Sequence, residues 1–116
     1  MENLLRRINF LDVPVDSVDL ESALKTIEAF LLDTHGHQIV FLTINKILKA
    51  RRDLDLMRCI RQSDLVLPVS KGIIGGARFQ KGASLDRYNL FAFTIRLLAL
   101  AERLDQSVYL LGARKE

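Results

Sequence analysis

The sequence predicts an α/β domain with a mainly parallel sheet flanked by helices. Three short apolar runs carry this prediction: residues 38–43 (QIVFLT), 65–67 (LVL) and 107–111 (SVYLL). Each run is too short for a helix and rich in strand-forming side chains, which is typical of parallel strands covered on both faces. Segments with the apolar spacing of helices separate the runs, and this alternation is typical of α/β folds.

The first third of the chain is expected to hold an extended segment and a helix. Residues 7–15 (RINFLDVPV) alternate apolar with polar side chains, and Pro14 indicates an edge strand or a turn. Asp19 is the predicted N-cap of the helix, whose apolar residues recur every three or four positions in LESALKTIEAFLL. Gly36 is expected to follow the end of this helix.

The remaining helices are predicted from the same spacing. Residues 45–62 form either one helix or two short ones, with Asp53 as the cap of the second. Residues 72–79 are expected to form a short helix, weakened by a Gly-Gly pair. Residues 90–104 carry the pattern of a long amphipathic helix, which leads to the apolar run at 107–111.

Chain length, net charge and cysteine content limit the classes of protein to which this sequence can belong. The chain has 116 residues, a formal net charge of +3 and one cysteine. This length suits a single domain over residues 1–116, and so mild a charge gives no argument for nucleic acid. A single cysteine allows neither an internal disulfide nor a cysteine-based metal cage. The chain starts without a signal peptide and has no apolar run near the roughly 20 residues that span a bilayer, so we expect a cytoplasmic protein that at most touches a membrane.

Polar residues follow two of the predicted strands, at the end where α/β proteins bind ligands. Ser70, Lys71 and Gly72 lie between a strand and a helix, where backbone N–H groups and a lysine favour an anion. Thr43 and Asn45 follow the preceding strand and can hydrogen-bond a sugar or nucleotide. Structural roles explain these residues equally well, with Ser70 as a helix cap beside a solvated lysine and Asn45 as an N-cap.

Arginines add a candidate phosphate site. Arg78 and Arg87 belong to a basic cluster and could bind a diphosphate, because a guanidinium matches phosphate geometry. The alternative is that both are solvated surface residues. No constellation of metal ligands is recognisable.

The order of several motifs resembles a known family. QIVFLTIN, ARRDLDL, SDLVLP, ARF, Arg87 and SVYLLG occur in one order, and the opening INFLDVPVDSVDLESALKTI fits the same pattern. The chain resembles the WecG/TagA/CpsF family of bacterial glycosyltransferases. The resemblance implies a Rossmann-like fold and inverting transfer of an N-acetylmannosamine-type sugar, without a metal or other cofactor. It implies a UDP-sugar donor, an undecaprenyl-diphosphate-linked acceptor and a place in cell-surface polysaccharide synthesis at the inner membrane face.

The resemblance also assigns roles to residues. Thr43 and Asn45 match the family's T-x-N, which lines the acceptor and catalytic pocket, and Arg87 matches an arginine that binds diphosphate. Val69 stands where the family has an Asp that is its general base, so no catalytic residue is assigned and Asp86 is only a weak candidate. Leu90 and Ala92 occupy the places of a family Gly and Asp.

Several expectations follow for the whole chain. It resembles the N-terminal part of the family domain, so the fold is expected to be truncated and this chain alone to be inactive. Apolar surface is expected to drive assembly into a homo-oligomer. The alternative function is a degenerate module that binds a nucleotide-sugar or a partner without turnover, and Val69 favours it.

Overall fold

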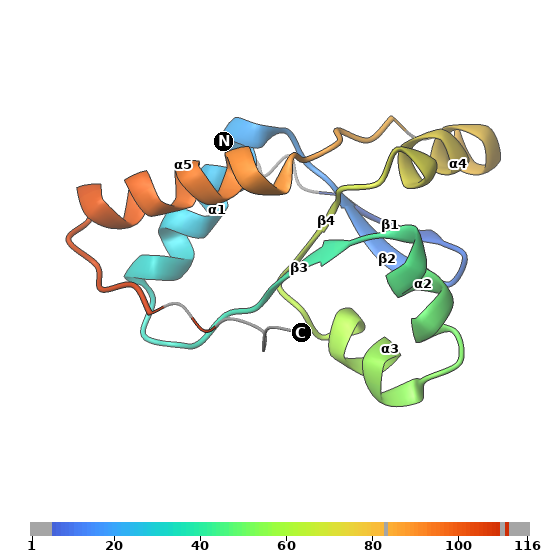
Figure 1. Ribbon diagram of the computed structural model, residues 1–116, viewed down its shortest axis with the longest axis horizontal. Helices are drawn as coiled ribbons and strands as arrows, with labels where there is room; N and C mark the ends of the chain where they lie inside the picture. The colour runs from blue at the N-terminus through green and yellow to red at the C-terminus, as the bar shows by residue number, and fades with distance from the viewer. Residues whose placement is uncertain (1–5, 83, 110, 112–116) are drawn as a thin grey trace, which may run out of the picture.

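The computed structural model describes residues 6–82, 84–109 and 111, and these form strands and helices in the order expected of an α/β fold (Figure 1). The elements are β1 (Arg6–Phe10), β2 (Val13–Ser17), α1 (Leu20–Leu32), β3 (Ile39–Leu42), α2 (Ile44–Ala50), α3 (Leu54–Arg61), β4 (Leu65–Pro68), α4 (Lys71–Lys81) and α5 (Leu90–Arg103). The prediction of an α/β fold with parallel strands between helices is confirmed.

The centre of the fold is the parallel pair of β3 and β4, in which Ile39 pairs with Leu65 and Leu42 with Pro68. Both faces of this pair are covered. Val66 packs into a core with α2, α3, α4 and the hairpin, while Leu65 and Leu67 pack into a second core with α1 and α5. Figure 1 shows the two groups of helices on opposite sides of the strands. This double burial explains why both strands are continuously apolar in the sequence.

The N-terminal segment is a hairpin rather than a single extended strand. β1 and β2 pair antiparallel from Arg6 opposite Ser17 to Phe10 opposite Val13. Leu11 and Asp12 form the turn with φ of 52° and 71°, and two consecutive positive φ values are typical of the tight hairpin turn that matches strand twist.

A buried carboxylate connects this hairpin to the parallel pair. Asp16 on β2 accepts a hydrogen bond from the backbone N–H of Val66 on β4, with 2.7 Å between Oδ2 and N. The same carboxylate accepts from Arg7 Nε at 2.6 Å and Nη2 at 2.8 Å. The hydrogen bond to Asp16 raises the pKa of Arg7, so the guanidinium stays charged.

The predicted caps define the helices. Asp19 accepts from Ser22 N at 2.7 Å at the start of α1, and Asp53 accepts from the N–H groups of Asp55 and Leu56 at the start of α3. The segment after β3 is therefore two helices, and Asp53 caps the second as predicted. Helix α1 ends at Leu32, before Gly36.

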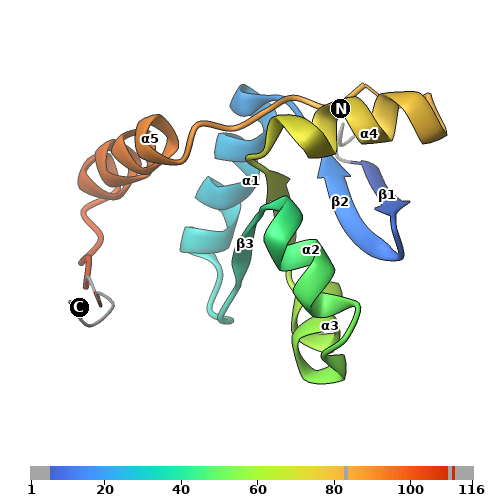
Figure 2. The same cartoon turned by 45° about the vertical axis from the view of Figure 1, so that its right-hand side comes forward.

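The third predicted strand is wrong for the residues that the structure describes. Residues 107–109 and 111 form no strand, and the side chain of Tyr109 is 87% exposed, while residues 110 and 112 lie outside the described part. After α5 the chain turns at Asp105, where φ is 58°. Figure 2 shows the segment beyond this turn standing away from β3. Strand-forming composition is not sufficient without a neighbouring edge.

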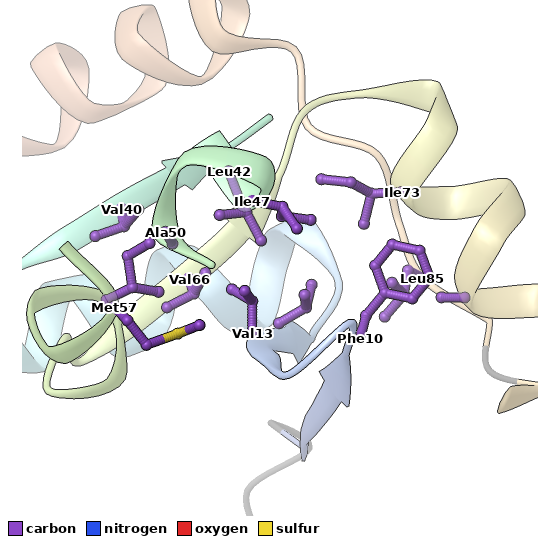
Figure 3. Close-up of a cluster of buried hydrophobic side chains, with 13 residues drawn as sticks. Phe10, Val13, Val40, Leu42, Ile47, Ala50, Met57, Val66, Ile73 and Leu85 are labelled. Atoms are coloured by element: carbon purple, nitrogen blue, oxygen red, sulfur yellow. The ribbon is translucent and has the colours of Figure 1, made fainter. Parts of the chain in front are cut away.

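Replacing either of two glycines of α4 by alanine is expected to change the stability of the fold, in opposite directions. A Cβ at Gly76 would lie 2.5 Å from Phe10 Cζ, whereas a Cβ at Gly75 would meet no atom within 4 Å. Figure 3 shows Phe10 reaching towards Ile73 and Leu85 in the core. We expect Gly76→Ala to destabilise the fold by about 1–3 kcal/mol through overpacking. Gly75→Ala, the matched control, should stabilise it by up to about 1 kcal/mol through helix propensity.

Urea denaturation of the two variants checks this prediction, with the free energy of unfolding taken from the transition midpoint and slope. Equal stabilisation by both substitutions would show that Phe10 does not pack against α4 as described.

Candidate functional site

The loops that follow β3 and β4 are joined at the carboxyl edge of the parallel pair. The backbone N–H of Val69 donates to Leu42 O at 3.0 Å, which extends the pairing one residue beyond β4. The N–H of Ile44 donates to Ser70 Oγ at 3.3 Å. The two loops that sequence analysis selected therefore form one continuous surface.

Thr43, not Asn45, caps α2. Thr43 Oγ1 accepts from Lys46 N at 3.1 Å, so the alternative of Asn45 as the N-cap is wrong. Asn45 is exposed in the first turn of α2. Lys46, which sequence analysis did not select, donates from Nζ to Phe41 O at 3.1 Å and brings a positive charge to this strand end. The only feature of the sequence that could have pointed to Lys46 is its position directly after Asn45.

Ser70 has a different role from the helix cap considered in the sequence. It is the residue before α4, but its hydroxyl makes no capping bond and instead holds Ile44. Lys71 and Gly72, the first residues of α4, are exposed. A Cβ at Gly72 would lie 3.1 Å from Ile44 Cγ1, so a residue without a side chain lets α4 begin close to α2.

Arg87 lies beside the loop after β4. Its Nε donates to Val69 O at 3.2 Å, and the next residue, Tyr88, donates its backbone N–H to Pro68 O at 2.9 Å. Tyr88 is buried, and its hydroxyl donates to Val18 O. Burial raises the pKa of Tyr88, which keeps the hydroxyl protonated as a donor. Tyr88 thus anchors the segment that presents Arg87. A shared phosphate site of Lys71 and Arg87 stays a prediction.

The position at which the resemblance places a general base carries no carboxylate. Val69 is half-buried against the core that includes α1 and α5, and its side chain has no atom that accepts a proton. Asp86 is exposed next to Arg87 and lines a groove of about 720 Å³ along the start of α5. Asp86 therefore remains a weak candidate and Val69 an unexplained departure. Arg78 lies further along α4, in its last turn.

Comparison with known proteins identifies the family. The model of the glycosyl transferase WecG/TagA/CpsF family matches residues 8–116. The chain belongs to this glycosyltransferase family. No curated protein matches the sequence. Membership in the WecG/TagA/CpsF family confirms the resemblance, while the roles of Thr43, Asn45 and Arg87 in substrate binding stay predictions.

Two further properties of this family member concern membranes and metals. Across the described stretches of chain, no helix combines the length and apolar character needed to cross a bilayer. The same residues contain no cluster of three or more His, Cys, Asp or Glu side chains that could hold a metal ion.

The opposite, amino-terminal edge of the strands carries a histidine between two carboxylates. His37 Nε2 lies 2.9 Å from Asp33 Oδ2, and Nδ1 lies 3.3 Å from Asp64 Oδ1. The ring stacks on Phe30 with 4.2 Å between ring centroids. Hydrogen bonding to Asp33, and then the nearby carboxylate of Asp64, raise the pKa of His37. This edge is therefore a structural ion cluster.

The cluster predicts a pH dependence. Because the pKa of His37 is raised on folding, its stabilisation is full below the unfolded value of about 6.5 and is lost as pH rises through the folded value. The urea concentration at the unfolding midpoint should therefore decrease as the pH is raised from about 6 to about 8. His37→Gln should reduce this slope, because it removes the titrating imidazole. An unchanged slope in His37→Gln would contradict the assignment.

Proposed function

We propose that the protein acts on an N-acetylmannosamine-type sugar carried by UDP and transfers it to an undecaprenyl-diphosphate-linked acceptor. The reaction would belong to bacterial cell-surface polysaccharide synthesis and take place in the cytoplasm, with peripheral contact at the inner membrane face. Family membership supports the reaction class. The choice of donor and acceptor rests on the resemblance of T-x-N and Arg87 to the family pattern.

The observation that carries this proposal is the contact of Arg87 with the loop after β4. The guanidinium donates to Val69 O, two residues before Lys71 in sequence, at the carboxyl edge where α/β proteins bind ligands. A guanidinium, an ammonium group and the first turn of α4 each favour a phosphate. Thr43 precedes α2 on the adjoining loop and Asn45 lies in the first turn of α2, and a sugar attached to that phosphate would extend towards them.

A second candidate function is binding without turnover, and Val69 favours it. Displacement at a sugar carbon requires removal of the proton from the attacking hydroxyl. Valine has no group for that step. The protein would then hold a nucleotide-sugar at the same loop and present it, or itself, to a partner. Both functions require the phosphate site, so its test comes first.

Lys71→Ala should weaken UDP binding by about 1–3 kcal/mol, the range for losing a hydrogen bond to a charged group. Lys81→Ala is the matched control, because it removes the same charge from the other end of α4. Isothermal titration of UDP into each variant measures the effect. Equal affinity for UDP in the two variants would remove Lys71 from the site, and an absence of UDP binding in the parent protein would reject both functions.

A further inference from the structure

Helix α5 has an apolar face that points away from the core. Phe93 and Leu100 are buried on its inner side, whereas Phe91 is 77% exposed and Ile95 is 50% exposed. Figure 1 and Figure 2 both show α5 at the edge of the molecule. The helical repeat places six exposed side chains together on the outer face of α5, namely Phe91, Ala92, Ile95, Leu98, Ala99 and Glu102. Large exposed apolar side chains gathered on one helix indicate an interaction surface.

The outer face of α5 is complementary to a second copy of itself in the antiparallel direction. When two such helices cross at Ile95, Phe91 of one copy lies level with Ala99 of the other, because both are four residues from the crossing point. Leu98 and Ala92, each three residues from Ile95, face each other in the same way. Each large side chain therefore meets an alanine, which is the alternation of large and small residues that close packing requires.

The charges at the two ends of the outer face are also complementary. In the antiparallel pair, Glu102 would lie level with Tyr88 of the other copy, one residue from Arg87. Arg87 is exposed, and its Nε is held by an uncharged carbonyl group. A carboxylate would therefore approach a guanidinium at each end of the pair, which favours this direction and register.

The charges along the side of α5 favour an apolar partner over an anionic one. Arg96 donates to Glu21 Oε2 at 3.3 Å, and Arg103 Nη2 lies 3.7 Å from Glu28 Oε1. Both carboxylates lie on α1 of the same copy, so they offset these two cations. The outer face is therefore bordered by neutralised charges, whereas an anionic membrane surface attracts clusters of unpaired Lys and Arg.

We propose that the outer face of α5 is a two-fold interface between two copies of this chain, with antiparallel helices that cross at Ile95. Ala92 lines the groove of about 720 Å³ at the start of α5, so Leu98 of the second copy would enter this groove. The second copy would also bring Glu102 to the segment that presents Arg87, and thus a carboxylate to the edge of the candidate site. The interface does not depend on the proposed function.

Light scattering of the full chain over a range of concentrations measures this association. We expect a dimer in the parent protein. Ile95→Arg should weaken the dimer at least about 100-fold, because a residue on a two-fold axis meets its own copy and two cations would be in contact. Phe79→Arg is the matched control and should leave the dimer unchanged, since Phe79 is 89% exposed on α4. Circular dichroism should show that both variants remain folded.

Disulfide formation under air tests the direction of the helices, in variants that also carry Cys59→Ser to remove an exposed thiol. Ile95→Cys should form a covalent dimer with itself, and Phe91→Cys should form one when mixed with Ala99→Cys. Facing residues of packed helices come within the roughly 7 Å between Cα atoms that a disulfide can span. Phe91→Cys alone should not react, because the two copies of residue 91 would lie about 12 Å apart along the helices.

Three results would overturn the proposal. A parent protein that stays monomeric at about 1 mM would show that the outer face is no interface between copies. A dimer that survives Ile95→Arg, or that Phe79→Arg disrupts equally, would place the contact elsewhere. Covalent dimers of Phe91→Cys alone that form as fast as those of its mixture with Ala99→Cys would contradict the antiparallel direction.

Discussion

Replacing Arg7 by alanine is expected to lower the free energy of unfolding by about 3 kcal/mol, the low end for breaking a buried ion pair. The reason is the carboxylate of Asp16, which is 1% exposed and would remain buried without its cation. Its remaining partner would be the N–H of Val66. The low end applies because the side chain of Arg7 is 32% exposed, so water can partly replace the guanidinium.

Arg58→Ala is the control for this prediction. Arg58 also pairs with an aspartate, Asp55, but both side chains are exposed and lie 3.4 Å apart. Such surface pairs contribute about 0–1 kcal/mol. Urea denaturation compares the two variants. Similar losses in Arg7→Ala and Arg58→Ala would mean that Asp16 is not buried, and the connection between the hairpin and β4 would need revision.

The second large effect concerns chemistry at Val69. We expect transfer of sugar from UDP-N-acetylmannosamine to a lipid-diphosphate acceptor to be slow, about 100- to 10,000-fold below a typical enzymatic rate, because valine at residue 69 supplies no general base. Val69→Asp supplies a carboxylate at the loop, and Val69→Asn supplies a similar shape without a base. A gain with Asp but not with Asn would assign the catalytic position to residue 69. Equal rates of sugar transfer in Val69→Asp and Val69→Asn, in variants that still bind UDP, would favour binding without turnover.

A parent protein that transfers sugar at about 10 per second, a typical enzymatic rate, would contradict this prediction. The base would then lie elsewhere, and Asp86, which is exposed beside Arg87, would be the first residue to replace with asparagine.

Local patterns in the sequence predicted the strands that are buried on both faces and the helix caps that bond to near neighbours in the sequence. β3 and β4 are buried on both faces, so their apolar runs were sufficient, and Asp19 and Asp53 cap helices through neighbours two or three residues away. The pairing of Asp16 could not be predicted in this way. Its partner N–H on Val66 is 50 residues distant, and only the tertiary fold brings the two together.

The candidate site likewise contains residues that local sequence predicts and residues whose place depends on the tertiary fold. Ser70, Lys71 and Gly72 were selected because they follow a strand, and they lie at the expected edge. Arg87 was selected as part of a basic cluster and by the resemblance. Its place beside Val69 depends on Tyr88, whose buried hydroxyl reaches Val18. Lys46 was missed because its ammonium group reaches a carbonyl at the end of β3, which no spacing rule indicates.

Both proposed functions require a diphosphate site at the carboxyl edge of β3 and β4. Titration of UDP into ¹⁵N-labelled protein, followed by backbone amide shifts, tests it most directly. We predict that the largest shifts occur at Lys71, Gly72 and Arg87, with small shifts at His37 and Asp64 on the opposite edge. Shifts concentrated at His37 and Asp64, or no saturable shifts at Lys71 and Arg87, would contradict the account.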